Sequence, residues 1–255
     1  MPNDIIYKEL MLIDSISFIN PVINFCAERN NYILTLDSNL EKIFKIDLNN
    51  FQRVETISLP QKISFLKGIA SDNIYIYLYS ENSLFRFDKI RGEIRSLINP
   101  QDRIRIADLA LTQQGEIFMS DDLNNRIVYI NTLGQMQTFS LSLKSLLIPS
   151  GIYFDDAKNR LWIINRAQQQ IEAYLKNGNI DKIVKLPSAQ FNRIFIAEPD
   201  IYVFNKMNSQ ISRIQDQSMI EYFIPGQKNI LNFFIYDSLM LILKPNGMYL
   251  YQIDK

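Results

Sequence analysis

A repeat of about 40 residues runs through the whole chain and constrains its fold more than any other feature. Short segments in which apolar and polar residues alternate, as they do in β-strands, recur along the chain. When the repeats are aligned, one apolar residue of each repeat falls at the same position. Repeats of this length are typical of propeller blades, each of which is a small four-stranded sheet. The sequence therefore predicts an all-β protein, a six-bladed β-propeller with four-stranded blades. The equivalent residues are Ile46, Phe87, Ile130, Tyr174, Ile214 and Ile253, with successive separations of 41, 43, 44, 40 and 39.

The positions of the prolines support the same division of the chain. Six of the nine prolines occur once per repeat, just ahead of the next repeat's first strand. Because proline has no N–H to donate to a β-ladder, it suits a connector between sheets. These residues are Pro21, Pro60, Pro100, Pro149, Pro187 and Pro225. We therefore predict a single domain, 1–255, whose blades span approximately residues 22–59, 63–98, 104–140, 149–186, 191–224 and 229–253.

The last repeat is short, and the N-terminus has a strand to spare. Only three strands can be placed from residue 229 onward, whereas residues 5–11 form an alternating segment that belongs to no repeat. Propellers protect unpaired edges by closing the ring of blades. We therefore expect residues 5–11 to close the ring as the outermost strand of the blade formed by residues 229–253.

The composition excludes several kinds of chemistry. The chain has no histidine and a single cysteine, Cys26, which removes Ser-His-Asp catalysis, histidine metal ligands and an internal disulfide. Its 27 basic and 27 acidic residues cancel, so no whole-domain field attracts nucleic acid or anionic lipid. The longest apolar region, Ile230 to Leu243, is interrupted by polar residues and falls well short of the roughly 18 uncharged residues that a membrane span needs. We expect a soluble protein, cytoplasmic if Met1 is the native start and extracytoplasmic if a signal peptide was removed.

Three segments carry motifs of a known repeat. Residues 149–153 read Pro-Ser-Gly-Ile-Tyr, residues 68–70 read Gly-Ile-Ala, and residues 121–127 read Asp-Asp-Leu-Asn-Asn-Arg-Ile. They resemble the NHL repeat family of β-propellers, whose unit opens with a Pro-x-Gly-Ile-Ala-like strand and later carries Asp-x-x-Asn-x-Arg-Ile. The resemblance implies a fold but no single activity, because propellers host enzymes, receptors and scaffolds. We interpret Asp121 and Asn124 as residues that bond the turn backbone, and expect Arg126 to pack over the neighbouring blade.

The predicted fold gathers polar residues at one face, where connectors enter the innermost strands around an axial channel. The residues expected at the channel entry are Asn24, Lys67, Asp108, Arg193 and Asn232, with Ser150 and Gly151 at the corresponding place in the fourth blade. The connectors add Lys62, Asp102, Arg103, Arg105, Asn192 and Lys228. As candidates for a binding face we select Lys62, Lys67, Arg103, Arg105, Asp108, Asn192, Arg193 and Lys228.

Three functions are compatible with these residues. The first is a non-catalytic scaffold that binds a protein or peptide on this face without a cofactor, since 13 tyrosines and 16 phenylalanines can supply interface anchors. The second is a hydrolase resembling the calcium-dependent sugar lactonases, in which Asn24, Asp108 and Asn232 would hold the ion. The third is single-stranded RNA binding by the basic residues, against which the acidic neighbours and the zero net charge argue.

Overall fold

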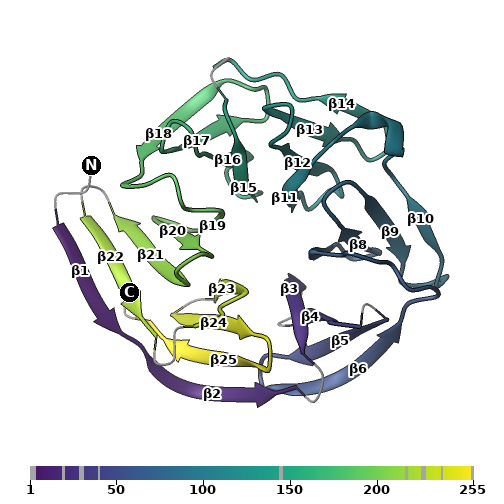
Figure 1. The fold of residues 1–255 in the computed structure, drawn as a ribbon, viewed down its shortest axis with the longest axis horizontal. Helices are drawn as coiled ribbons and strands as arrows, with labels where there is room; N and C mark the ends of the chain where they lie inside the picture. The colour runs from purple at the N-terminus through teal and green to yellow at the C-terminus, as the bar shows by residue number, and fades with distance from the viewer. Residues whose placement is uncertain are drawn as a thin grey trace. The chain divides into compact units, whose positions relative to one another are not determined.

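The computed structural model describes residues 4–18, 21–28, 32–39, 41–143, 146–215, 218–224, 228–236 and 238–253. Within these ranges the regular secondary structure is β-strand, apart from one short 3-10 helix, η1 (Pro100–Asp102). The six sheets are the blades of a six-bladed β-propeller (Figure 1), each built on four strands and one of them extended by a fifth, so the predicted fold class is confirmed. None of the described residues belongs to a helix that is long and apolar enough to cross a membrane.

The first three blades use four consecutive strands each. The first contains β3 (Val22–Glu28), β4 (Tyr32–Asp37), β5 (Lys42–Asp47) and β6 (Gln52–Ser58). The second contains β7 (Gly68–Ser71), β8 (Tyr75–Tyr79), β9 (Leu84–Asp88) and β10 (Ile94–Ser96). The third contains β11 (Ile106–Leu111), β12 (Ile117–Asp121), β13 (Arg126–Ile130) and β14 (Met136–Thr138).

The fourth and fifth blades repeat this order, and the sixth takes only three strands from the end of the chain. The fourth contains β15 (Pro149–Asp155), β16 (Arg160–Asn165), β17 (Gln170–Leu175) and β18 (Ile180–Lys185). The fifth contains β19 (Arg193–Ala197), β20 (Asp200–Asn205), β21 (Gln210–Gln215) and β22 (Ser218–Phe223). The sixth contains β23 (Asn232–Tyr236), β24 (Leu239–Lys244) and β25 (Gly247–Gln252).

The chain divides into two compact units. Unit 1 comprises Met1–Glu9 and Ile104–Lys228 and holds the third, fourth and fifth blades. Unit 2 comprises Leu10–Arg103 and Asn229–Lys255 and holds the first, second and sixth blades. That the whole chain forms one domain stays a prediction.

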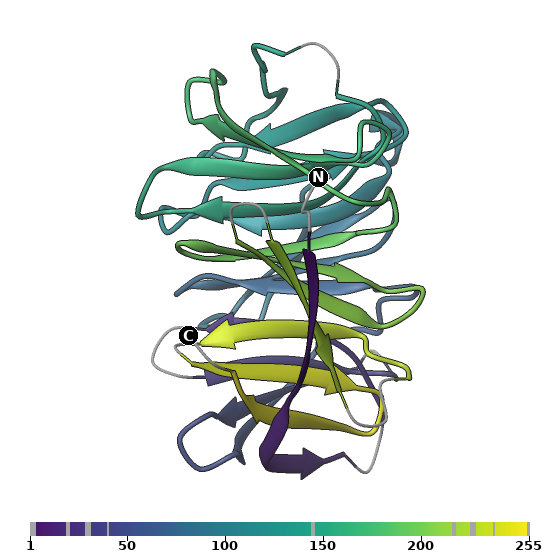
Figure 2. The same cartoon turned by 90° about the vertical axis from the view of Figure 1, so that its left-hand side faces the viewer.

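Two N-terminal strands complete the fifth and sixth sheets. β2 (Met11–Ser17) pairs antiparallel with β25, so an N-terminal strand does border the last blade. The predicted residues 5–11 were wrong for this role, because β1 (Asp4–Glu9) instead pairs in parallel with β22 and adds a fifth strand to the fifth blade (Figure 2). Residues 4–9 and 11–17 both form strands, so their sequences alone do not show which of them borders the last blade. The partner of β1 is a parallel strand more than 200 residues away, and such a pairing has no connecting turn that the sequence could reveal.

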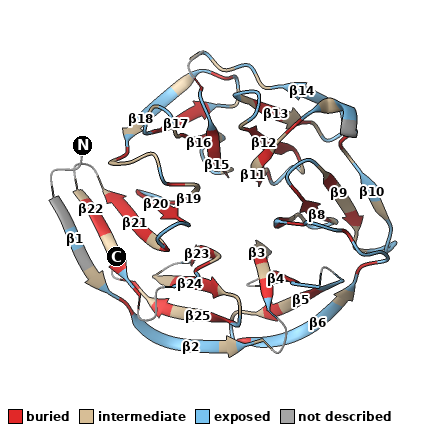
Figure 3. Cartoon of the chain, viewed as in Figure 1, coloured by how far each residue is buried: buried red, intermediate tan, exposed pale blue. Residues whose placement is uncertain are grey.

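Burial follows the order of strands within each blade (Figure 3). The second strands are buried almost throughout, as in β12 and β20, whereas the fourth strands of the first four blades are largely exposed, as in β6 and β14. The fourth strand of the fifth blade, β22, is mostly buried, and β1 pairs with its outer edge. In the middle blade of each unit the second strand, β16 or β4, packs against neighbouring blades on both faces, which explains why its sequence is nearly continuously apolar.

Apolar clusters between neighbouring blades form the core of each unit. In unit 1, Phe118 of the third blade stacks on Phe154 of the fourth with ring centroids 5.3 Å apart. In unit 2, Leu36 packs with Leu78 between the first and second blades. Each such buried side chain contributes about 1.5–3 kcal/mol relative to exposure.

Candidate functional site

Two asparagines link the first strands of the sixth and first blades to each other and to the connector before the second blade, all in unit 2. The Nδ2 of Asn232 on β23 donates to the Oδ1 of Asn24 on β3 at 2.7 Å. The Nδ2 of Asn24 in turn donates to the carbonyl oxygen of Lys67 at 2.8 Å, and its Oδ1 also accepts the N–H of Phe25 at 2.8 Å. Both asparagines are buried, and a buried amide that is bonded in this way stabilises the packing of the blades. The amides predicted at the channel entry are therefore engaged in structural hydrogen bonds.

Lys67 does not occupy the strand position equivalent to Asn24. The strand pairing gives that position to Gly68, and Lys67 is exposed in the connector before it. The ring of Tyr79 fills the space that a side chain at this position would take, since a Cβ on Gly68 would meet it. The predicted equivalence of Lys67 with Asn24 is therefore wrong by one residue. The reason is that β3 has a β-bulge just before Asn24, whereas β7 has none.

In unit 1 an ion pair joins two first strands. The Nη1 of Arg193 on β19 lies 3.1 Å from the Oδ1 of Asp108 on β11. The N–H of Ile152 donates to the Oδ2 of the same carboxylate at 3.4 Å. Gly151 on the intervening blade permits the approach, because a Cβ there would lie 2.8 Å from the Cα of Arg193. Asp108 and Arg193 are thus brought together, as a pair of opposite charges.

The donor set predicted for calcium does not fit a metal site. Asn24 and Asn232 are bonded to each other, and Asp108 is paired with Arg193. Calcium takes about six to eight oxygen ligands that converge on one point. In the part of the chain that the structure describes, no three acidic, histidine or cysteine side chains group as a metal site would require.

The Asp121 motif closes the turn between the second and third strands of the third blade. The Oδ2 of Asp121 accepts from the Nδ2 of Asn124 at 2.7 Å and from the Nε of Arg126 at 2.9 Å. Its Oδ1 accepts the N–H of the connector residue Arg105 at 3.1 Å. The turn-bonding role of Asp121 is confirmed, since its Oδ1 also accepts the backbone N–H of Asn124 at 3.3 Å. The Asn124 side chain bonds the carboxylate of Asp121. The guanidinium of Arg126 is held by the same carboxylate, and its packing over the neighbouring blade stays a prediction.

The connector from the first to the second blade presents an exposed aromatic ring on a fixed backbone. Ile63 and Leu66 are buried in the core between these blades and anchor the connector at two points. Phe65, between them, is 88% exposed and has a φ of 62°, in the left-handed region that bulky residues rarely adopt. Lys62 and Lys67 beside it are also exposed.

Positive φ values recur at other connectors. Arg103, which follows η1, is exposed and has a φ of 50°. In unit 1, Ile148 is exposed with a φ of 52° and donates its N–H to the Oδ1 of Asn125 at 2.7 Å. The preceding N–H, of Leu147, donates to the Oδ1 of Asn165 at 3.3 Å. An asparagine from a turn, Asn125, and one from the end of β16, Asn165, therefore hold the backbone of this connector.

The other predicted residues have separate surroundings. The Nε of Arg105 pairs with the Oδ1 of Asp122 at 2.6 Å. The Oδ1 of Asn192 accepts the N–H of Lys206 at 3.3 Å, and Lys228 is exposed. The candidate set divides between the units, with Lys62, Lys67 and Arg103 in unit 2 and Arg105, Asp108, Asn192, Arg193 and Lys228 in unit 1.

The sequence reasoning missed Phe65 and Ile148. In a strand-rich sequence an apolar residue beside other apolar residues normally indicates core. The exposure of these two side chains depends on a positive φ, which glycine would signal but phenylalanine and isoleucine do not. The available signal was indirect, namely the two apolar residues, Ile63 and Leu66, that flank Phe65 at the start of the predicted second blade, 63–98.

The comparisons with known proteins identify a fold and no family. No protein-family model matches the chain, and no curated protein matches it significantly. Among solved structures, it resembles a catalytically inactive virginiamycin B lyase from Staphylococcus aureus with quinupristin, in which a histidine is replaced by alanine. The two share 17% identity over 91% of this chain and 80% of that chain, with a TM-score of 0.67.

Two further similar structures contain protein or peptide partners. A chain of a nidogen/laminin complex has a TM-score of 0.64 and 12% identity, covering 81% of each chain. YCF48 bound to a D1 peptide has a TM-score of 0.62 and 10% identity, covering 95% of this chain and 97% of that chain. At these identities the likeness concerns the fold alone, and it supports a β-propeller architecture for this chain.

Proposed function

We propose that this chain is a non-catalytic binding propeller that recognises a protein or peptide through the connectors leading into its blades. The observation that carries the proposal is Phe65, a nearly fully exposed aromatic side chain on a backbone anchored by Ile63 and Leu66. Aromatic residues supply much of the binding energy at protein interfaces.

The conformation of Phe65 is costly in the isolated chain. A left-handed backbone conformation costs roughly 1–2 kcal/mol for a residue with a side chain. Leaving a phenylalanine in water forgoes about 1.5–3 kcal/mol of burial. A partner that covers the ring would recover the burial term, and because the backbone is already fixed, little ordering entropy would be lost on binding.

The charges around Phe65 favour a partner with acidic residues. Lys62 and Lys67 are exposed on the same connector. The ion pair of Lys62 with Glu41 measures 3.9 Å between two largely exposed groups, and such pairs contribute at most about 1 kcal/mol. We therefore propose a peptide that places an apolar side chain on Phe65 and acidic side chains beside it.

Three further observations support binding over catalysis. The polar side chains at the starts of the first strands are engaged with each other, as in the Asp108–Arg193 and Asn24–Asn232 contacts. The similar lyase structure described as inactive lacks one histidine, and this chain has none at all. The nidogen/laminin and YCF48 structures are examples of a similar fold with protein or peptide partners.

We also propose that the repeats are of the NHL type. The geometry around Asp121 supports this, since the motif's Asp, Asn and Arg side chains bond one another within a single turn. In the first and fifth blades a short polar residue likewise ends the second strand and accepts a turn N–H, as Asp37 does from Glu41 and Asn205 from Met207. This contact of the motif is thus retained in two blades whose other motif residues differ.

The test uses peptides selected from a random displayed library on the immobilised full chain. Phe65→Ala should weaken the selected peptides at least about tenfold, since a hot-spot residue contributes about 2 kcal/mol or more. Ile90→Ala is the matched control, because Ile90 is 85% exposed in the same unit but lies in the turn after β9. The proposal fails if no peptide binds, or if both variants bind equally well.

The lactonase alternative has its own test. Calcium-dependent hydrolysis of sugar lactones by the purified chain, abolished by Asp108→Asn without unfolding, would replace the scaffold proposal with an enzymatic one.

A further inference from the structure

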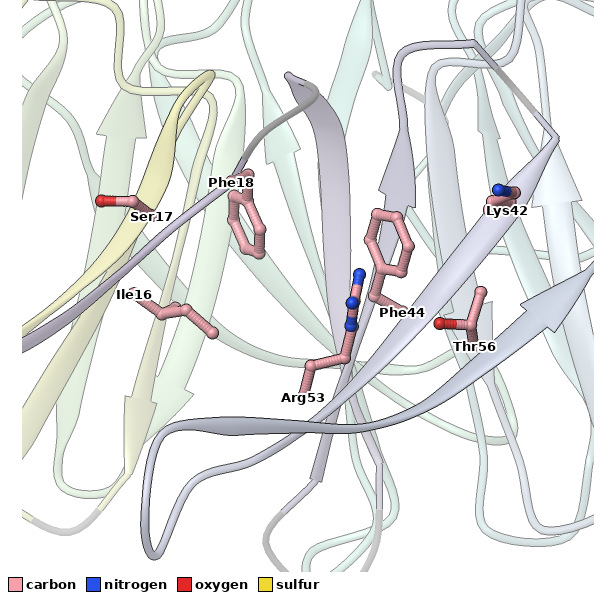
Figure 4. Close-up of a pocket in the computed structure, with 7 residues that line it drawn as sticks. All are labelled: Ile16, Ser17, Phe18, Lys42, Phe44, Arg53 and Thr56. Atoms are coloured by element: carbon pink, nitrogen blue, oxygen red, sulfur yellow. The ribbon is translucent and has the colours of Figure 1, made fainter.

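A cavity of about 460 Å³ lies in unit 2, between β2 and the outer strands of the first blade (Figure 4). Its volume falls within the range of small-molecule sites, about 300–1,000 Å³. The cavity is lined by both apolar and cationic side chains. The lining residues used in the argument below are Ile16, Phe18, Lys42, Phe44, Arg53 and Thr56.

A β-bulge brings Arg53 to this cavity. The pairing of β5 with β6 is regular where Phe44 faces Thr56, and it shifts just before Ile46, so that Ile46 faces Arg53. Without the shift Ile46 would face Val54. Because side chains alternate between the two faces of a sheet, the bulge places Arg53 on the face of Phe44 and Thr56. Its guanidinium lies over the Phe44 ring, 5.1 Å from the centroid.

The other wall comes from the end of β2. Phe18 donates its N–H to the carbonyl oxygen of Asn246 at 2.9 Å, which fixes the chain as it leaves the strand. Gly247 lets β2 approach, since a Cβ there would lie 2.7 Å from the carbonyl oxygen of Ile16. Figure 4 shows Phe18 and Phe44 on either side of Arg53. The cavity thus offers two aromatic surfaces with a cation between them.

The two cations of the cavity, Lys42 and Arg53, form no ion pair in the part of the chain that the structure describes. There, neither of them lies within 4.0 Å of a carboxylate oxygen. Glu41, next to Lys42 in sequence, points its carboxylate to Lys62 instead. Two cations beside apolar walls favour a ligand that is itself amphipathic, with an anionic head and an apolar body.

We propose that this cavity binds a small aromatic carboxylate. The guanidinium of Arg53, oriented by its contact with Phe44, donates to the carboxylate, and Lys42 adds a second positive charge. The aromatic body packs against Phe18 and Ile16 beside the guanidinium, and the Thr56 hydroxyl, which lines the same cavity, donates a further hydrogen bond. This site is separate from the connectors of the proposed function and does not depend on it.

The test is calorimetric titration of the full chain with naphthoate and with uncharged naphthalenemethanol. Naphthoate should bind more tightly than the alcohol, and Arg53→Gln should weaken it about tenfold, which corresponds to about 1.4 kcal/mol. Lys45→Gln is the matched control, because Lys45 lies on the same strand with its Nζ over the Tyr32 ring, 4.4 Å from the centroid, and does not line the cavity.

Several outcomes would overturn the proposal. They are absence of naphthoate binding at millimolar concentration, equal affinity for the alcohol, and an equal loss in Lys45→Gln. Thermal melts verify that the variants fold. If Arg53→Gln does not fold, Lys42→Gln decides the question by the same comparison, with a loss of about threefold or more expected.

Discussion

Replacing Glu116 with glutamine should destabilise unit 1 in a pH-dependent way. Glu116 precedes β12, and its carboxylate accepts from the hydroxyl of Tyr129 and the Nζ of Lys176, both at 2.5 Å. The Thr112 hydroxyl donates to it at 3.3 Å. Because Lys176 follows β17, this cluster joins the third blade to the fourth, and its loss should lower the free energy of unfolding.

The pKa of Glu116 determines the sign of the effect. Burial raises this pKa, but the hydrogen bonds from Lys176 and Tyr129 outweigh burial and hold it below its ordinary value of 4.5. A carboxylate whose pKa is lower in the folded state stabilises the fold above its unfolded pKa, and this contribution is lost as the pH falls through the folded pKa.

The magnitude follows from the number and exposure of the bonds. A hydrogen bond to a charged group contributes about 1.5–3 kcal/mol, and the partial exposure of Lys176 screens its share. We expect Glu116→Gln to reduce the free energy of unfolding by about 1–2 kcal/mol at neutral pH. The difference from the wild type should shrink steadily as the pH falls below 4.5.

Urea denaturation over a pH series provides the assay. Glu93→Gln is the control, since its pair with Arg95 at 3.2 Å is exposed on both sides and should change stability by less than about 0.5 kcal/mol. Burial and Glu116 raise the pKa of Tyr129 to about 12, so ultraviolet titration should show a tyrosine that ionises earlier in Glu116→Gln. A loss that is the same at pH 7 and at pH 4 would refute this reasoning.

Three other perturbations should behave as follows. Gly178→Ala should lower the melting temperature more than Gly92→Ala, as thermal melts of the two variants would show. Both glycines have positive φ, but only at Gly178 would a Cβ collide with a backbone oxygen, that of Ser140. Asn232→Ala should cost about 1–3 kcal/mol by removing a buried tie between blades, as urea denaturation would show; a loss within error would contradict it. Removing residues 1–17 should lower the unfolding midpoint more than removing residues 1–9, since only the longer deletion takes β2 from β25; equal midpoints would count against this.

Much of the fold could be predicted from local patterns. Strand alternation and turn residues recur in every blade, and side chains such as Asp121 act within a few residues of their own position. Such short-range contacts can be recognised from residue types at nearby positions in the sequence. The strand that borders β25 could not be identified in this way. Residues 4–9 and 11–17 both read as strands, and they differ only in which distant strand each one pairs with.

The candidate sites were harder to predict because they depend on single-residue shifts. A bulge in β3 is enough to misplace Lys67 by one position, and a bulge opposite β5 places Arg53 rather than Val54 in the cavity. The exposure of Phe65 depends on one backbone angle. Bulges and left-handed residues other than glycine have no residue type of their own, so periodicity alone could not reveal these features.

Partner recognition at the connectors can be measured by hydrogen exchange of the full chain with and without a selected peptide. We expect slowed exchange of backbone amides within residues 61–67, around Phe65, and unchanged exchange in the turn at residues 88–93. Protection confined to segments outside the connectors, with residues 61–67 exchanging as in the free chain, would contradict it.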